Sequence, residues 1–385
     1  MKHRSLGLLI SAEVGALAVW FSSAAVLADL QAEFEFSVHY AALLSSTVQA
    51  GFAVGAVPYA VFGLADRFDP RRVFAVSALL AAALNLTMLL LTPGSTAFLF
   101  GRFFTGAFLA GVYPVGMKLA VGWGVRDRGL LVGLLVGALT LGSAAPHLLA
   151  AMGGADWRWT IMFTSALAAV AALLVMGVGL GPHHGKAAVF AVRDLSLAWR
   201  DRKLRLAFAG YLGHMWELYA FWAWIGVALT IALGDGSGAL EKARLITFTA
   251  IATGAVACVL AGVVADRIGK ANVTIIAMTG SGAMALAAAA AFNVSTLWLT
   301  VVVVLWGATV IADSAQFSAL VADVAPPRAV GSLLTLQTAL GFGLTVFTVQ
   351  LTPVLADRLG WPGVFVVLAL GPLAGTLSML RFKAH

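Results

Sequence analysis

Seven ionisable side chains lie inside long apolar stretches of this sequence, where an uncompensated charge is unfavourable. If such a stretch crosses a bilayer, an ionisable group at its centre costs about 3 kcal/mol on insertion scales, so residues of this kind usually handle ions, substrates or protons. These seven residues are therefore the first candidates for chemistry. They are Glu13, Arg102, Lys118, His147, His214, Glu217 and Asp313.

His214 and Glu217 form the most suggestive pair among them. They are three residues apart, so on a helix their side chains are neighbours. Counting 1.5 Å per residue places Glu217 near the middle of its apolar stretch. A carboxyl group held out of water beside a histidine can gain and lose a proton near physiological pH. We therefore expect Glu217, assisted by His214, to carry a coupling proton.

Arg102 offers a rigid fork of donors that suits carboxylates and inorganic anions. Tyr113 follows 11 residues later, close to three helical turns, so the two side chains share a face. By depth, Arg102 lies across the membrane centre from Glu13 and Asp313. A buried guanidinium needs an acid, carbonyl groups or substrate as its partner. We expect it to bind an anionic substrate.

Other polar and aromatic side chains in the same stretches complete the predicted binding site. Trp20 can form part of its wall, and Gln316 and Gln337 supply amide groups. The predicted substrate-binding residues are Arg102, Tyr113, Glu13, Trp20, Asp313, Gln316 and Gln337.

The composition indicates a membrane protein that spans the bilayer many times. Apolar residues make up 61% of the 385 and charged residues 11%, against about 25% charged in soluble domains. Inside lipid the backbone must satisfy its own hydrogen bonds, so the apolar stretches form helices. The net charge of +7 does not come from a basic patch of the kind that binds nucleic acid. Of the 24 Lys and Arg residues, 18 fall at the termini and in alternate loops, which places both termini in the cytoplasm.

The apolar stretches divide the chain into two halves joined by a basic connector. We predict an N-terminal six-helix bundle over 1–181, a cytoplasmic connector over 182–204 and a C-terminal six-helix bundle over 205–385. The twelve expected helices cover 6–28, 40–64, 73–91, 97–121, 129–151, 160–180, 205–232, 243–264, 272–292, 297–321, 331–355 and 362–381.

Two loops repeat each other and indicate an internal duplication. Asp66-Arg67 follows the second helix of the first half, and Asp266-Arg267 follows the second helix of the second half, 200 residues later. Repeats of this kind are frequent in secondary transporters. Acidic and basic groups at helix ends can also pair with each other and with helix dipoles.

The repeated loop resembles that of the major facilitator superfamily of transporters, which runs G-x-L-A-D-R-x-G-R-K. The second copy, from Gly262 to Lys270, fits this motif closely; the first departs from it, with Asp69 at the second glycine position and Pro70 in addition. Arg102 followed by Gly106 also agrees with the family. The resemblance implies twelve transmembrane helices in two pseudo-symmetric bundles, transport by alternating access, and a conformational latch formed by Asp66, Arg67, Asp266 and Arg267.

The class of substrate remains open between several alternatives. Stretches 111–118 and 312–317 resemble bacterial members labelled nitrate or nitrite porter-like, although the Asn-Gly-Gly signature of true nitrate porters is missing. Antiporters of the family usually show a Gly-Pro dipeptide in the fifth helix, whereas Gly142 and Pro146 are separated here, which favours symport or uniport. With Arg102 as the anion ligand, we expect proton-coupled transport of a small organic or inorganic anion. Efflux of a drug or metabolite in exchange for protons is the main alternative. Transport of a divalent metal is a further alternative, because Glu13, His214, Glu217 and Asp313 offer suitable ligands.

Several classes of function are disfavoured. The sequence contains no nucleophile motif or phosphate-binding loop, so an enzyme is not expected. Its single cysteine, Cys258, excludes an intramolecular disulfide and a multi-cysteine metal site. We expect no cofactor, no resident metal and no nucleic-acid partner, and a monomer in the bacterial inner membrane whose partners are a small solute, protons and lipid.

Overall fold

The computed structural model describes residues 1–124, 127–154, 156–185 and 190–385, and within these ranges it contains helices and no strands. Residues 186–189 of the predicted connector lie outside the described residues. The helices long enough to matter for the architecture are α1 (Lys2–Leu17), α2 (Ser22–Ala25), α3 (Leu27–Glu33), α4 (Val38–Val61), α5 (Leu64–Arg67), α6 (Pro70–Leu86), α7 (Thr96–Leu109), α8 (Tyr113–Val121), α9 (Arg128–Met152), α10 (Trp157–Met176), α12 (Arg202–Leu233), α13 (Ala239–Ile268), α14 (Lys270–Ala291), α15 (Thr296–Ile311), α16 (Ser314–Val324) and α17 (Val330–Lys383).

The described chain crosses the bundle twelve times, as predicted. Ten helical segments are long and apolar enough to span a membrane. One of them, α17, contains a break at Gly360, where φ is 67°, and therefore makes two passes. The interrupted run α1–α3 supplies the remaining pass. This first pass begins at Lys2 and ends at Glu33, which makes it longer than the predicted 6–28, and it is broken in the middle.

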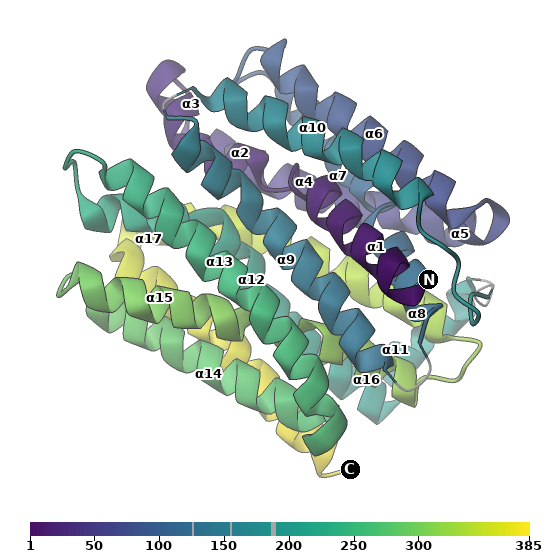
Figure 1. Cartoon of the computed structure of the whole chain (residues 1–385). Coiled ribbons are helices and arrows are strands. Elements are labelled where there is room, and N and C mark those ends of the chain that lie inside the picture. Colours follow the sequence, from purple (N-terminus) through teal and green to yellow (C-terminus); the bar gives the residue numbers. More distant parts are fainter. Residues whose placement is uncertain (125–126, 155, 186–189) are drawn as a thin grey trace.

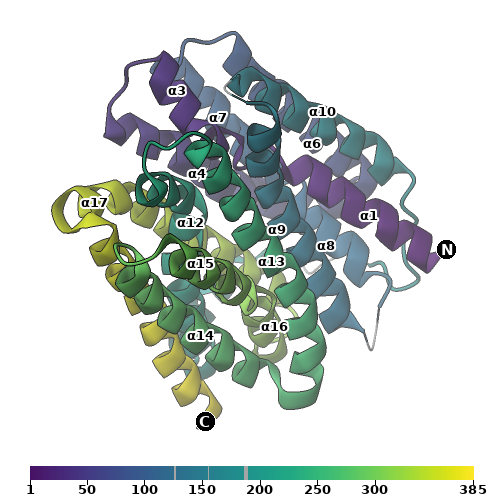
Figure 2. The same ribbon diagram turned by 60° about the vertical axis from the view of Figure 1, so that its left-hand side comes forward.

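The two halves of the chain lie side by side as separate groups of helices (Figure 1). In the first half α4 packs on α7, and α10 packs on α6 and α1; in the second half α17 packs on α12 and α14, and α15 on α13 and α14. The halves meet mainly where α9 runs along α13 and where α4 runs along α17. Both views place the two termini towards the same end of the bundle (Figures 1 and 2). We call this the proximal end, and the opposite end the distal end.

Small residues allow α9 and α13 to approach closely across the boundary between the halves. A Cβ added to Gly133 would lie 2.9 Å from the carbonyl oxygen of Cys258, and one added to Gly137 would lie 3.0 Å from that of Ala255. Close backbone approach of this kind is the usual reason for small residues between membrane helices. The contact therefore depends on glycine rather than on charge.

Three passes are interrupted near the middle of the bundle. The first is broken between Leu17 and Ser22, the fourth between Leu109 and Tyr113, and the tenth between Ile311 and Ser314. Tyr113 and Asp313, 200 residues apart, thus lie at corresponding breaks in the two halves. Irregular backbone inside a membrane protein must find partners in the protein or line a cavity. The breaks are therefore where the candidate site is built.

Candidate functional site

Arg102 is fully buried beside the break in the first pass. Its Nη2 donates to the carbonyl oxygens of Trp20 at 2.7 Å and Val19 at 3.1 Å. Its Nη1 donates to Asn85 Oδ1 at 2.7 Å and Ser22 Oγ at 3.2 Å. The guanidinium therefore satisfies carbonyl groups that the broken helix leaves free.

This placement differs from the one expected from the sequence in two respects. Of the three partners considered for Arg102, protein carbonyl groups occupy its fork in this structure, and its two terminal nitrogens are engaged. The break between Leu109 and Tyr113 also interrupts the helical register on which the shared face of Arg102 and Tyr113 depended. Tyr113 is half-buried at the start of α8, whereas Arg102 is enclosed between the break in the first pass and α6.

Glu13 lies on α1 and is fully buried. Among the described residues, neither of its carboxyl oxygens has a hydrogen-bond partner. The carboxyl group rests on Gly116 of α8, where an added Cβ would lie 1.7 Å from Glu13 Oε1. An unpaired charge is costly in such surroundings. This position therefore suits a neutral carboxylic acid, or a carboxylate whose partner arrives with the solute.

Glu217 is also buried, but both of its oxygens are engaged. Ser281 of α14 donates to Oε2 and the indole of Trp306 on α15 donates to Oε1, each at 2.7 Å. Phe221, one turn further along α12, packs on Trp306 with ring centroids 4.6 Å apart. The carboxyl group thus points into the second half and has neutral donors as partners.

His214 lies one turn before Glu217 and faces the break in the tenth pass. Its Nδ1 is 2.9 Å from Asp313 Oδ1, and both side chains are buried. The ring packs on Phe317 of α16 with centroids 5.8 Å apart. Within the described part of the chain, His214 Nε2 has no partner. The structure thus brings two of the predicted residues from different helices into contact.

Aromatic rings from both halves meet on the distal side of these acids. We call this group the ring cluster; its members are Trp20, Phe21, Phe52, Tyr219, Trp222 and Phe342. Trp20 lies 4.8 Å from Phe52, 5.6 Å from Phe342 and 5.9 Å from Tyr219, measured between ring centroids. All six rings are buried. The cluster closes the space between the halves towards the distal end.

Several neutral polar groups next to the ring cluster lack hydrogen-bond partners among the described residues. They include the indole nitrogens of Trp20 and Trp222 and both amide atoms of Gln49 on α4. Gln49 lies one turn from Phe52 and one turn from Ser46, which accepts a 2.7 Å bond from Gln350 Nε2 of the second half. Buried polar groups of this kind normally bind water or a ligand.

The two predicted glutamines lie in the second half. Gln337 is buried on α17, one turn before Gly341, whose missing side chain makes room for the ring of Tyr211. Its amide nitrogen is another group without a partner in the described structure. Gln316 is buried on α16, one turn after Asp313. Gln316 is thus next to the His214–Asp313 contact.

The first copy of the repeated loop is tied to its own half. Lys118, at the end of α8, donates from Nζ to Asp66 Oδ1 and to the carbonyl oxygen of Ala65, the latter at 2.8 Å. Lys118 is thus engaged by protein acceptors, as Arg102 is.

The second copy lies against the other half. A Cβ added to Gly129, at the start of α9, would lie 3.0 Å from Asp266 Oδ1. Arg67 and Arg267 are both exposed. The role of these loops as a conformational latch stays a prediction.

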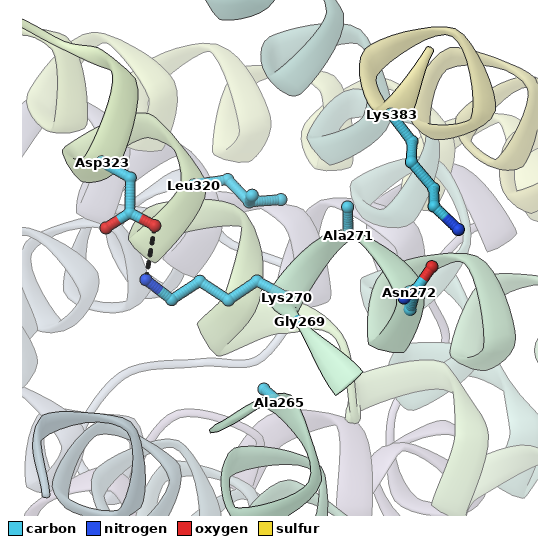
Figure 3. A pocket seen from close by; sticks show the side chains of 8 residues that line it. All are labelled: Ala265, Gly269, Lys270, Ala271, Asn272, Leu320, Asp323 and Lys383. Atoms are coloured by element: carbon cyan, nitrogen blue, oxygen red, sulfur yellow. Dashed lines mark hydrogen bonds and ion pairs between the residues drawn. The ribbon is translucent and has the colours of Figure 1, made fainter. Parts of the chain in front are cut away.

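A surface pocket of about 360 Å3 opens at the proximal end of the second half (Figure 3). Gly269 and Lys270 of the second loop line it together with Asp323 and Lys383. Lys270 Nζ donates to Asp323 Oδ2 at 2.5 Å (Figure 3). The pocket contains none of the predicted substrate-binding residues.

The alternative of a divalent-metal site finds no support in the geometry. Glu13 rests on α8, and Glu217 is held by Ser281 and Trp306. Across the described ranges, no group of three or more His, Cys, Asp or Glu side chains is placed to share a metal ion.

Sequence reasoning overlooked a buried ion pair between the halves. Arg244 of α13 donates from Nη2 to Asp29 Oδ2 of α3, and both side chains are buried. Asp29 follows the first predicted apolar stretch and Arg244 lies at the very start of the eighth, so neither position indicates a charge buried in the membrane. Gln49 and Asn85 were also missed, because uncharged polar residues are frequent in membrane helices and carry little signal.

Twelve passes in two groups, with buried acids and unpaired polar groups near helix breaks, define a secondary transporter. The family model described as Major Facilitator Superfamily matches residues 8–346, and the chain belongs to this superfamily. No curated protein matches the chain in sequence.

Solved structures confirm the fold. A mutant of the nucleoside transporter NupG is 13% identical, with a TM-score of 0.72 and coverage of 98% of this chain and 99% of that one. The proton:xylose symporter XylE bound to 6-bromo-6-deoxy-D-glucose is 15% identical, with a TM-score of 0.71 and coverage of 99% and 96%. XylE from E. coli in a partially occluded inward open conformation is 13% identical, with a TM-score of 0.74 and coverage of 99% and 98%.

Proposed function

We propose that this protein is a proton-coupled symporter of a small, uncharged, polar solute, with its termini and connector in the cytoplasm of a bacterium. We infer an uncharged solute because the buried basic side chains already have partners in the protein, whereas the groups near the ring cluster that lack partners are neutral. Arg102, Lys118 and Arg244 are each engaged by protein acceptors. Groups near the ring cluster that lack partners, such as the amide of Gln49, are neutral.

A solute with hydroxyl or amide groups would satisfy these neutral donors and acceptors, and its carbon skeleton would pack on the rings of Trp20 and Tyr219. Binding of this type combines a mostly apolar wall with a few placed polar groups. The similar structures are those of a nucleoside transporter and a xylose symporter, whose named solutes are of this chemical type. The anion expected from the sequence depended on a guanidinium available to substrate, and Arg102 does not offer one in this conformation.

Proton coupling rests on the buried acids. Glu13 has no partner, Glu217 has two neutral donors, and Asp313 has His214, so in the described structure none of the three carboxyl groups is paired with Lys or Arg. A carboxyl group without a fixed cation can alternate between its charged and neutral forms at lower cost than a member of an ion pair. We propose Glu217 as the proton carrier, His214 with its partner Asp313 as the neighbouring titratable groups one turn away, and Glu13 as a group that faces the solute.

The substrate class is tested by a thermal-shift screen of the purified protein against pentoses and hexoses, nucleosides, nitrate and carboxylates, lipophilic cations and divalent metals. We expect stabilisation by members of the first two groups, followed by counterflow of the best ligand in proteoliposomes. Stabilisation only by nitrate or a carboxylate, abolished in Arg102→Lys, would favour the anion instead. Stabilisation only by lipophilic cations would favour drug efflux.

A substitution at Gln49 tests whether the unpaired amide of this residue binds the solute. Gln49→Leu removes an unpaired amide, so we expect the ligand-free protein to be at least as stable as the parent. Ligand affinity should fall about tenfold, which corresponds to the loss of roughly one hydrogen bond. The matched control is Gln31→Leu, at an exposed position of α3, which should leave affinity unchanged. Equal affinity in both variants would remove Gln49 from the site.

A further inference from the structure

Arg244 connects three elements across the boundary between the halves, at the distal end of the bundle. It belongs to α13 in the second half, whereas its partners lie in the first half. Nη2 donates to Asp29 Oδ2 on α3, and Nη1 donates at 3.2 Å to the carbonyl oxygens of Ala150 and Gly154 at the end of α9. Arg244 is 6% exposed and Asp29 7%. One side chain thus holds two passes of the opposite half.

The surroundings of this guanidinium make the contact strong while the halves are together. The carbonyl group of Ala150 belongs to the last turn of α9, where a helix is negatively polarised and attracts a cation. Asp29 adds a full negative charge in a charge-assisted hydrogen bond. Because both side chains are shielded from water, their attraction is screened less than that of a surface pair.

The same contact weakens when the halves separate. In a member of this superfamily, alternating access requires the space between the halves to open at one end and then at the other. When the distal end opens, Arg244 and Asp29 enter water, where an isolated ion pair contributes little. The pair therefore stabilises the distally closed conformation more than the open one, which is the condition for shifting such an equilibrium.

We propose that Arg244 and Asp29 form a distal gate, a buried ion pair that keeps this end closed and separates in each transport cycle. The break in the first pass supports this role, because Asp29 lies on the distal side of the interruption between Leu17 and Ser22. The distal part of the first pass can therefore move without carrying the whole helix. The ring cluster and the Gln350–Ser46 bond lie nearer the centre of the same boundary. The proposal does not depend on the solute class.

Distances between spin labels on the two halves test the gate. Labels at Glu35→Cys and Ser237→Cys, both on exposed distal loops, report separation of the halves at this end. Cys258 is replaced by Ser to leave two labelling sites. In the parent we expect mainly the short distance. Asp29→Asn, which is nearly isosteric, and Arg244→Gln should each raise the ratio of long to short distances about tenfold.

The matched control breaks another ion pair at the same end but within one half. Arg158 Nη2 lies 2.6 Å from Glu33 Oε1, and both residues belong to the first half and are partly exposed. Arg158→Gln should leave the distance distribution unchanged. If Arg244→Gln fails to fold, Asp29→Asn still decides the question, together with Arg244→Lys, for which we expect a smaller shift in the same direction. Unchanged distributions in folded Asp29→Asn and Arg244→Lys would show that the pair is a fixed structural contact, and would overturn the gate without affecting the proposed solute class.

Discussion

Replacing Arg102 separates a structural role from a role in substrate binding. In Arg102→Ala the carbonyl oxygen of Trp20 loses its bond from Arg102. The Ser22 hydroxyl lies 3.0 Å from the carbonyl oxygen of Val19 and 2.8 Å from Asn85 Oδ1 and can donate to only one of them, so a second acceptor is also left without a donor. Each buried acceptor left without a partner costs about 1–3 kcal/mol. Removing the buried charge of Arg102 offsets part of this loss of stability, because a buried charge is itself costly. We therefore expect a net loss of roughly 3 kcal/mol.

Thermal unfolding in detergent measures this loss. For a unit the size of one six-helix half, about 3 kcal/mol corresponds to a decrease in Tm of roughly 6–12 °C. Arg102→Lys keeps one charge but not the fork, so its Tm should lie between those of the parent and of Arg102→Ala. Arg158→Ala, at a partly exposed position, is the control and should change Tm little.

A different result is expected if Arg102 binds the substrate. If Arg102→Ala unfolds at the parent temperature and has lost an anion that stabilises the parent, the guanidinium is a substrate ligand and the role of its carbonyl bonds has been misjudged. If the variant is destabilised but its folded fraction binds solute within about threefold of the parent, the structural role holds.

Three further predictions concern other sites. Gly116→Ala should destabilise the protein by about 1–3 kcal/mol in thermal unfolding, because its Cβ would lie 1.7 Å from Glu13 Oε1, and adding Glu13→Ala should recover much of the loss; additive losses in the double variant would contradict this contact. Glu217→Gln should abolish pH-driven accumulation in proteoliposomes while exchange between solute pools continues, and undiminished pH-driven uptake would reject Glu217 as the proton carrier. Asp69 accepts the backbone N–H of Arg71 at the start of α6, so Asp69→Ala should cost about 0.5–2 kcal/mol at neutral pH. The Arg71 guanidinium lowers the pKa of Asp69, so this contribution is present above the ordinary pKa of the group and lost as pH falls through the lowered value; a stability difference that grows on acidification would contradict it.

The sequence by itself determined the class of protein, the number of passes and the duplication. Apolar length and the scarcity of charge leave the backbone no alternative to helices in lipid. The repeat of Asp66 at Asp266 also predicted that the two halves would be built alike. Tyr113 and Asp313 lie at corresponding helix breaks, which extends the same 200-residue repeat.

Tertiary structure alone decided which partner each buried charge has. Arg102, Glu13 and Glu217 looked alike in the sequence as ionisable residues in apolar stretches. In the fold Arg102 donates to carbonyl groups of a broken helix, and Glu217 accepts hydrogen bonds from two neutral donors. Glu13 has no partner in the described structure. The pair of Asp29 and Arg244 joins positions 215 residues apart. Local periodicity gives the face and the depth of a side chain, but the partner that sets its chemistry comes from another helix, whose rotation and breaks are fixed only by packing.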